Sequence, residues 1–460
     1  MDVDSDADSR FADGTRNFVD WFQGLPGATF RADLIAVEDL RGRNAGRGII
    51  AKQDIAPDTT LFTIPRNAII YQSESGNEDG PSSSQDSWTL LILVLIYEYL
   101  QGDASAWKPY LDVLPSVFDT PMFWPPAELS ELQASALVAK VGKEEADRMI
   151  TSKILPVVRE HEHLAHRMGS AIMAYAFDLE KDDDNDGVDE DDEWVEDREG
   201  KTMLGMVPMA DILNADAEFN AHINHGDDAL TATTLRTIRA GEEVLNYYGP
   251  LPNGELLRRY GYVTPKHSRY DVVELPWELV ETELKERVGV RVDPADWEKV
   301  RQLARSDEDF EESFVLERSG EDPDSTGQLS SEPTFSGLPD ELADQFKTFL
   351  KAVKKVASIE LAVQALEDKE MRKDLYLQAV LGALQSRERQ YATSLEDDDR
   401  ILSVGELTGR QRMAVWVRRG EKQLLREAQS WVRQEMNERR NKASDRTGGN
   451  DGPAAKRRRF

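Results

Sequence analysis

Two separated regions of short β-type runs constrain the fold of this chain more than any other feature. In residues 35–71 apolar pairs alternate with turn-forming residues, and residues 203–263 contain alternating runs such as Leu230–Leu235. The residues between these regions repeat apolar side chains at helical spacing. Ile55–Leu61 and Ile238–Val244 share one strand-turn-strand rhythm. The pattern therefore predicts two halves of one sheet, separated by a helical insertion.

The helical segments follow from the spacing of apolar residues. Before the second β region, helices are predicted over Thr15–Phe22, Trp88–Leu100, Glu128–Lys140, Lys143–Val158 and His163–Leu179. Beyond Trp277 three further apolar stripes predict an all-α domain, interrupted at Asp307–Pro339 by an acidic Ser/Gly/Pro-rich loop.

Composition narrows the class of protein. The 460 residues contain no cysteine, which excludes disulfide frameworks, thiolate zinc sites, iron–sulfur clusters and cysteine nucleophiles. The acidic amino terminus lacks a signal-peptide core, and the longest apolar run, Leu90–Tyr97, is too short to cross a bilayer. We therefore expect a soluble intracellular protein with no membrane partner.

The charge favours a basic partner. With 56 Lys+Arg against 87 Asp+Glu, the formal net charge is −31, which repels phosphate backbones and attracts basic polypeptides. Direct nucleic-acid binding is therefore not expected. Alternatively, the charge serves only to keep the protein soluble.

Two motifs resemble metal sites, and neither is assigned as one. Asp182–Glu193 satisfies the twelve-residue calcium-loop pattern, but it lies in a window, Glu180–Glu199, that holds 13 acidic residues, and Asp189 occupies an apolar position of the pattern. A solvated acidic insertion is the favoured interpretation. His161–His166 lacks a histidine at Ala165, where a zinc helix would need one.

Three other segments carry a more specific combination. They are the turn Gly42–Gly48, the segment Val207–Asp216 with its Asp-Ile-Leu-Asn core, and Glu243–Val263, which contains Tyr-Gly-Pro and Arg-Tyr-Gly-Tyr. Together they resemble the SET-domain protein-lysine N-methyltransferases. The resemblance is to the cysteine-free subgroup that includes Rubisco large-subunit methyltransferase and the fungal ribosomal-protein lysine methyltransferases.

The resemblance covers most of the chain and implies an α+β fold. It implies a split SET-domain β-fold with a helical insertion, followed by an all-α substrate-binding domain. The expected parts are an acidic segment and helix at 1–33, the SET domain at 34–263, the substrate-binding domain at 264–440 and a disordered basic tail at 441–460. Within the SET domain we expect the helical insert at about 88–179 and the acidic disordered insertion at 180–200.

The resemblance also implies S-adenosylmethionine as cofactor and assigns the site residues. Tyr248 is the expected catalytic residue. The expected cofactor-binding residues are Ala45, Gly46, Arg47, Gly48, Tyr175, Asp211, Asn214, Ala215 and Tyr260. The expected substrate-binding residues are Trp88, Ala176 and His225. Ala215 departs from the family, which commonly has histidine after the asparagine.

The resemblance implies that the methyl acceptor is a lysine of a basic non-histone protein. A ribosomal protein of the large subunit is the first expected acceptor, and histones are less favoured. We expect the protein to be a monomer. We expect it in the nucleus, because Lys456–Arg459 suits nuclear import, with the cytoplasm as a second compartment. Two alternatives stay open: a SET-fold binding module that has lost catalysis, and an acidic calcium-binding or chaperone-like protein.

Overall fold

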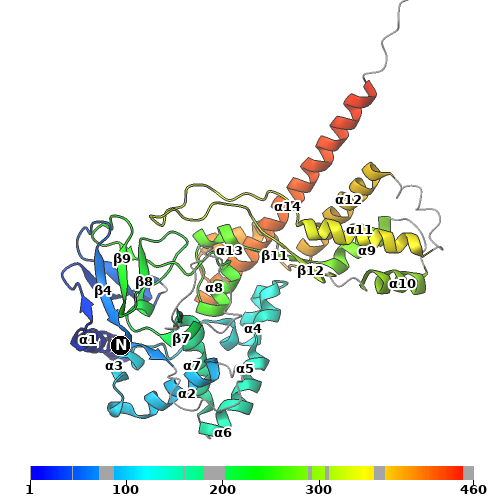
Figure 1. Ribbon diagram of the computed structural model, residues 1–460. Helices are drawn as coiled ribbons and strands as arrows, with labels where there is room; N and C mark the ends of the chain where they lie inside the picture. The colour runs from blue at the N-terminus through cyan, green and yellow to red at the C-terminus, as the bar shows by residue number, and fades with distance from the viewer. Residues whose placement is uncertain are drawn as a thin grey trace, which may run out of the picture. The chain divides into compact units, whose positions relative to one another are not determined.

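The structure is a computed structural model that describes residues 2–43, 45–71, 87–158, 161–180, 202–287, 293–305, 310–356 and 368–448. The chain divides into two compact units, and Figure 1 shows the elements of each. Unit 1 comprises Met1–Ala127, Ala139–Ser268 and Glu321–Glu332; unit 2 comprises Glu128–Val138, Arg269–Gly320 and Pro333–Phe460. The calcium-loop motif Asp182–Glu193 and the basic run Lys456–Arg459 lie outside the described residues.

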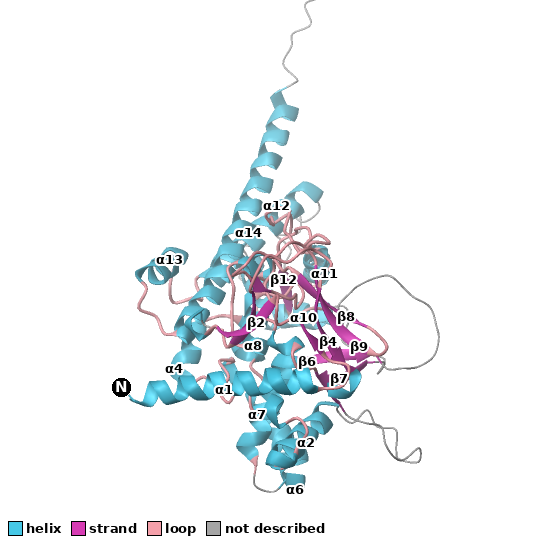
Figure 2. Cartoon of the chain, turned by 90° about the vertical axis from the view of Figure 1, so that its left-hand side faces the viewer, coloured by secondary structure: helices cyan, strands magenta, loops and turns pink. Residues whose placement is uncertain are grey.

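Three small antiparallel sheets form the β part of unit 1 among the residues that the structure describes. The first has the order β1-β4-β9-β8, the second β10-β3-β2 and the third β5-β7-β6. Their strands are β1 Thr29–Phe30, β2 Ile35–Asp39, β3 Arg47–Ala51, β4 Thr60–Pro65, β5 Ile70–Tyr71, β6 Ala176–Glu180, β7 Thr202–Met206, β8 Ala221–His225, β9 Ala229–Thr234 and β10 Glu243–Val244. Figures 1 and 2 both show β4, β8 and β9 side by side.

Strands from either side of the helical insertion pair with each other, as the sequence pattern predicts. Thr63 pairs with Thr231 in the first sheet, and Ile49 pairs with Val244 in the second. The two similar segments meet directly, because Ile55 and Ile238 exchange backbone hydrogen bonds of 2.8 and 3.0 Å. The prediction of one sheet is wrong in number, since the described strands of unit 1 form three sheets, and these strand pairings belong to two of them.

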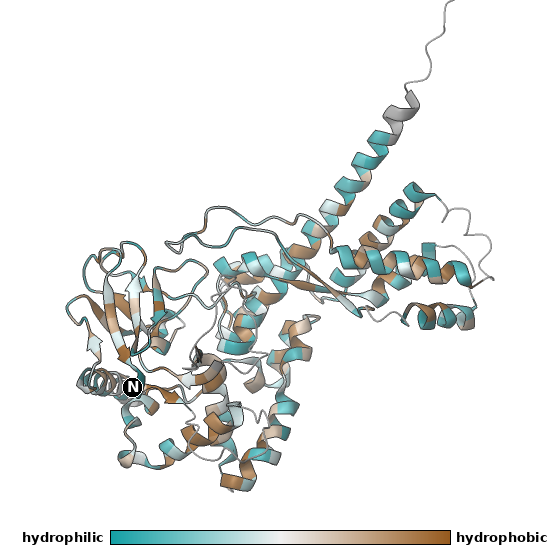
Figure 3. Ribbon diagram, viewed as in Figure 1, coloured by the Kyte–Doolittle hydropathy of each residue, from teal (hydrophilic) through white to brown (hydrophobic). Residues whose placement is uncertain are grey.

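Helices cover these sheets. In unit 1 they are α1 Asp2–Gly24, α2 Ser87–Leu100, α3 Lys108–Leu111, α5 Lys143–Met149, α6 Leu155–Val158, α7 Glu162–Tyr175 and α8 Asn253–Tyr260. The short α4, Pro126–Leu129, lies where the chain passes from unit 1 to unit 2. The apolar colouring of α2 in Figure 3 matches its role, because Leu91, Ile92, Leu95 and Ile96 are all buried in the core of unit 1.

The predicted helix ends need correction. The helix predicted over Thr15–Phe22 extends over the whole of α1. Glu128–Lys140 folds into the end of α4 and two 3₁₀ turns, and Lys143–Val158 is divided by a π-helical segment at Ile150–Ile154. The helix predicted over His163–Leu179 stops at Tyr175, because Ala176–Glu180 pairs with Met206–Thr202 as a strand.

Unit 2 is mainly helical. Its helices are α9 Trp277–Arg287, α10 Pro294–Arg305, α11 Asp340–Lys355, α12 Lys369–Glu388, α13 Leu395–Val404 and α14 Gly409–Gly448. The predicted stripe of α11 is buried, including Phe346, Phe349 and Val353. The all-α prediction is incomplete, because β11 Val273–Pro276 pairs with β12 Ser313–Leu316, and β12 lies in the segment predicted as a loop.

Unit 2 also buries a cluster of charges. The Asp398 carboxylate on α13 forms ion pairs with Arg418, at 3.1 Å, and with Lys422, both on α14. All three side chains are at most 2% exposed. Buried charges require such pairing, since an isolated ion in a protein interior is costly.

None of the described helices is both long and apolar enough to cross a lipid bilayer.

Candidate active-site pocket

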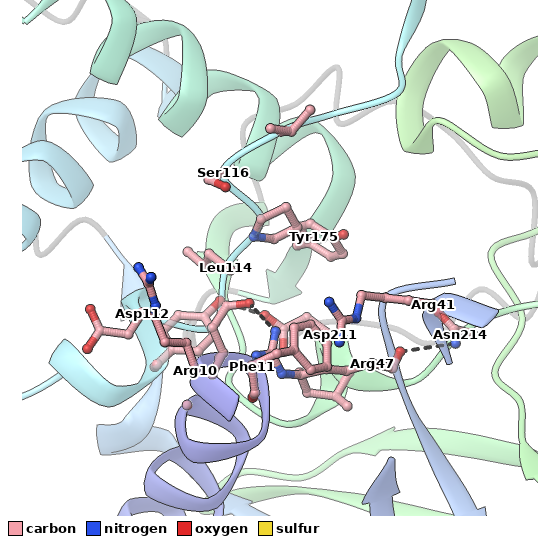
Figure 4. A pocket seen from close by; sticks show the side chains of 17 residues that line it. Arg10, Phe11, Arg41, Arg47, Asp112, Leu114, Ser116, Tyr175, Asp211 and Asn214 are labelled. Atoms are coloured by element: carbon pink, nitrogen blue, oxygen red, sulfur yellow. Dashed lines mark hydrogen bonds between the residues drawn. The ribbon is translucent and has the colours of Figure 1, made fainter. Parts of the chain in front are cut away.

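A pocket of about 480 Å³ lies in unit 1 beside β3 and α1 (Figure 4). Five of the predicted cofactor-binding residues line it: Gly46, Arg47, Tyr175, Asp211 and Asn214. These residues come from β3 and its turn, the end of α7, and the 3₁₀ turn η8, Ala210–Ile212, with the residues after it. The fold therefore brings together residues that are 168 positions apart in the sequence, from Gly46 to Asn214.

Asp211 is a buried carboxylate in this pocket. Its Oδ2 atom accepts a hydrogen bond of 2.6 Å from the Tyr110 hydroxyl, and its Oδ1 atom has no hydrogen-bond partner within the described part of the chain. Burial disfavours the charged carboxylate and raises the pKa of Asp211 to about 7. A buried acceptor with a spare lone pair suits a ligand that donates hydrogen bonds or carries positive charge.

The raised pKa of Asp211 predicts that the unliganded protein loses stability as pH rises. Between about pH 4 and pH 7 the folded state holds this proton and the unfolded state does not, so the free energy of unfolding falls through that range and levels off above it. Three pKa units correspond to about 4 kcal/mol, an upper bound for this group. Urea unfolding at pH 5 and pH 7.5 measures the difference. The difference in the free energy of unfolding between the two pH values should be smaller in Asp211→Asn than in the wild type. An equal difference in the two proteins would contradict the assignment.

Helix α1 forms one wall of the pocket. The guanidinium groups of Arg41 and Arg47 both lie over the Phe11 ring, at 4.1 and 3.9 Å from its centroid. Arg47 also donates hydrogen bonds of 2.9 Å to Thr15 Oγ1 and to the Val113 carbonyl. The Arg47 side chain therefore holds α1 in place and leaves backbone atoms of its turn facing the pocket.

Sequence reasoning missed this wall. Arg10 and Phe11 of α1, and Tyr110 with Asp112–Val117 after it, line the pocket without belonging to any motif. The only hint was the apolar face of α1, which buries Phe18 and Phe22 in the core of unit 1. That face predicts packing against the domain but not a place beside a pocket.

Asn214 joins the turn to the segment Val207–Asp216. Its Nδ2 atom donates to Glu243 Oε1 at 2.7 Å and to the Arg47 carbonyl at 3.2 Å. A Cβ atom at Gly48 would stand 2.9 Å from this nitrogen and 2.8 Å from the glutamate oxygen, so a larger residue there would displace the side chains of Asn214 and Glu243.

Three half-buried tyrosines form a cluster beside the pocket. The rings of Tyr248 and Tyr260 lie 4.8 Å apart, and the Tyr260 and Tyr262 rings 6.2 Å apart. The Tyr248 hydroxyl donates to the Leu213 carbonyl at 2.9 Å, and the Tyr262 hydroxyl donates to the Ala215 carbonyl at 3.3 Å. Burial raises the pKa of all three tyrosines, so their hydroxyls are neutral at physiological pH.

Backbone pairing explains why this cluster forms. Asn246 donates to the Asn214 carbonyl at 2.9 Å, and Ala215 and Asn246 form a parallel bridge. The segment that carries Tyr248 is thereby fixed to the segment that carries Asn214, and Asn214 lines the pocket.

The remaining predicted residues occupy other places. Ala45, Gly48 and Ala215 are chain neighbours of lining residues but are not part of the lining themselves. Trp88 is half-buried at the start of α2, Ala176 pairs with Met206, and His225 is exposed at the end of β8. The structure does not bring these last three into the pocket, and their role in substrate binding stays a prediction.

Comparison with known proteins gives two family matches. Residues 46–249 match the SET domain, and residues 315–425 match the Rubisco LSMT substrate-binding domain. The ribosomal lysine N-methyltransferase 4 of Saccharomyces cerevisiae is 35% identical over 302 residues, which cover 60% of this chain and 60% of that protein. The N-lysine methyltransferase setd6 of Xenopus laevis is 30% identical over 239 residues, covering 47% of this chain and 51% of its own length.

Solved structures agree on the fold. The SET domain of LSMT bound to lysine and AdoHcy superposes with a TM-score of 0.63 at 22% identity, covering 93% of this chain and 92% of that one. Rubisco LSMT bound to AdoMet gives the same TM-score and identity, covering 96% and 97%. The matched region spans 60% of the length of the yeast protein and 51% of the length of the Xenopus protein. In this chain, a region similar to the SET domain is therefore followed by a region similar to the Rubisco LSMT substrate-binding domain.

Proposed function

We propose that this protein transfers a methyl group from S-adenosylmethionine to a lysine side chain of a basic protein. The observation that carries the proposal is the half-buried pair Tyr248–Tyr260, located beside a pocket whose lining residues Asp211 and Asn214 lie in the region that matches the SET domain. The names of the related proteins and the ligands of the similar structures support the same reaction.

The residues present fit the proposed cofactor. Asp211 Oδ1 offers a buried acceptor for an ammonium group, and the turn at Gly46–Arg47 offers backbone atoms close to the pocket. The cofactor would supply a methyl group on a positively charged sulfur. The pocket is within the range of volumes that hold small ligands.

The tyrosine cluster suits the acceptor. Free lysine has a pKa near 10.4 and is protonated at pH 7, so a nucleophilic amine must first lose its proton. A buried aromatic channel disfavours the ammonium form and aligns the amine for in-line displacement. Because the Tyr248 hydroxyl donates to Leu213, its oxygen retains lone pairs that can accept weak contacts from a polarised methyl group.

A ribosomal protein of the large subunit is the proposed acceptor, with histones second. The similarity to the yeast ribosomal lysine methyltransferase and the charge of −31 support a basic protein acceptor. We further propose that the protein acts as a monomer in the nucleus.

Transfer of labelled methyl groups tests the proposal. Incubation with labelled S-adenosylmethionine and separated ribosomal proteins or histones should label lysine in one or a few of them. Asn214→Ala should lose labelling through weaker cofactor binding, measured by calorimetry. Cofactor binding without any transfer by the wild-type protein would favour a SET-fold binding module, and absence of both would reject the assigned site.

A further inference from the structure

One loop from the C-terminal half of the sequence belongs to the unit that contains the pocket. Residues Glu321–Glu332, which we call the arm, are part of unit 1, whereas the chain on both sides of the arm is part of unit 2. Ser319 and Thr334 close the base of the arm with two backbone hydrogen bonds of 2.9 Å. The arm therefore has a defined start and end.

The tip of the arm is a compact turn held by Asp324. The Oδ1 atom of Asp324 accepts hydrogen bonds from the Thr326 amide at 2.8 Å, the Thr326 hydroxyl at 2.6 Å and the Gln328 amide at 3.1 Å. These bonds lower the pKa of Asp324, so the carboxylate is charged at neutral pH. Gly327 adopts a φ of +75°, which glycine permits. The turn is thus shaped by its own residues.

This tip docks on Phe219. The Phe219 amide donates to the Gly327 carbonyl at 3.0 Å. A Cβ atom at Gly327 would stand only 2.3 Å from the Phe219 carbonyl oxygen, so no other residue fits. Beside it, the Glu218 carboxylate accepts a hydrogen bond from the Leu329 backbone, and it binds Lys266 at 2.5 Å.

Phe219 in turn contacts the chain that carries Tyr248. Its ring stacks on Tyr247, with centroids 4.7 Å apart and planes at 15°. The two neighbouring rings have different partners, since Tyr247 packs on Phe219 while Tyr248 packs on Tyr260.

We propose that the arm is a positioning element for Tyr248. Docking of Gly327 on Phe219 fixes the Tyr247 ring, and the Tyr247 ring fixes the backbone that presents the Tyr248 hydroxyl. The proposal rests on the proposed function in one respect, namely that Tyr248 contacts the reacting groups.

Gly327→Ala tests the proposal in the full-length protein. The added methyl group should push the tip off Phe219, and a misplaced catalytic group slows a reaction that depends on alignment. We expect kcat for methyl transfer to fall about 10- to 100-fold, with KM for S-adenosylmethionine changed by less than about twofold. Gly405→Ala is the matched control, because Gly405 also has a positive φ, of +90°, and a Cβ atom there would meet nothing within 4 Å. Its kcat should equal that of the wild type.

A second pair of variants covers the case in which Gly327→Ala does not fold. Tyr247→Leu removes the stacked ring and should lower kcat as Gly327→Ala does, whereas Tyr247→Phe keeps the ring and should restore most of the activity. If wild type is active and both Gly327→Ala and Tyr247→Leu match it in kcat, the proposal is overturned.

Hydrogen exchange separates this proposal from the proposed function. The Asn246 amide, which is bonded to the Asn214 carbonyl, should exchange faster in Gly327→Ala than in Gly405→Ala. If the wild-type protein transfers no methyl group, the proposed function fails and this measurement alone decides the role of the arm. Equal exchange over residues 245–248 in the two variants would then reject it.

Discussion

Tyr248→Phe should lower the rate of methyl transfer by about 100- to 1,000-fold while leaving cofactor binding nearly unchanged, the loss typical when one polar group that acts on the transition state is removed. Phenylalanine preserves the ring that packs 4.8 Å from Tyr260, so the variant should fold as the wild type does. It lacks the hydroxyl that bonds to Leu213 and is proposed to contact the methyl group. Single-turnover transfer of labelled methyl groups measures the effect.

Tyr262→Phe is the matched control. The Tyr262 hydroxyl bonds to the Ala215 carbonyl at 3.3 Å, which is longer than the Tyr248 bond, and Tyr262 is not assigned to catalysis. Its removal should change the rate much less than Tyr248→Phe does. Equal losses in the two variants would indicate that the hydroxyls serve packing of the cluster, and would remove Tyr248 from the catalytic role.

Asp398→Ala should lower the free energy of unfolding by about 3 kcal/mol. The substitution leaves the Arg418 and Lys422 cations buried without their shared carboxylate. Removal of one partner from a buried ion pair typically costs about 3–5 kcal/mol. The lower end applies here, since Arg418 keeps Glu131 at 2.9 Å and Lys422 keeps the Thr393 carbonyl at 2.9 Å. Urea unfolding gives the change in the free energy of unfolding.

The adjacent Asp399→Ala tests whether burial is the cause. Asp399 pairs with Arg419 at 2.6 Å, but its side chain is 51% exposed. Exposed ion pairs contribute about 0–1 kcal/mol, so this variant should unfold at nearly the urea concentration of the wild type. Similar losses at both positions would mean that the helix α13, and not the buried charge, accounts for the effect.

Local pattern was sufficient to predict some elements. The apolar run from Trp88 predicted a helix to Leu100, and α2 does end at Leu100. The prediction was possible because this one run supplies the buried face of the helix. Through the family resemblance that they carry, the turn at Gly46 and the motif around Asn214 also predicted four residues that line one pocket, namely Gly46, Arg47, Asp211 and Asn214. In each case the residues that allow the prediction lie close together in the sequence.

Other features depend on partners far along the chain. Ala176–Glu180 has the composition of a helix end, and it becomes a strand because Thr202–Met206 pairs with it. The same holds for β12, whose partner β11 begins 40 residues earlier, at Val273 against Ser313. The place of Phe11 beside the pocket depends on Arg41 and Arg47, which no spacing rule connects to it.

The strand pairing across the helical insertion also bears on how the protein is made. Thr63 of β4 pairs with Thr231 of β9, so β4 waits for a neighbour that is 168 residues further along. At about 5–20 residues per second, a ribosome needs about 10–30 s to add that length. During this interval apolar strand residues such as Leu61, Phe62 and Ile64, all buried in the finished protein, have no sheet partner from the second β region. The nascent chain should therefore be a client for chaperones that shield unpaired strands until β9 has emerged.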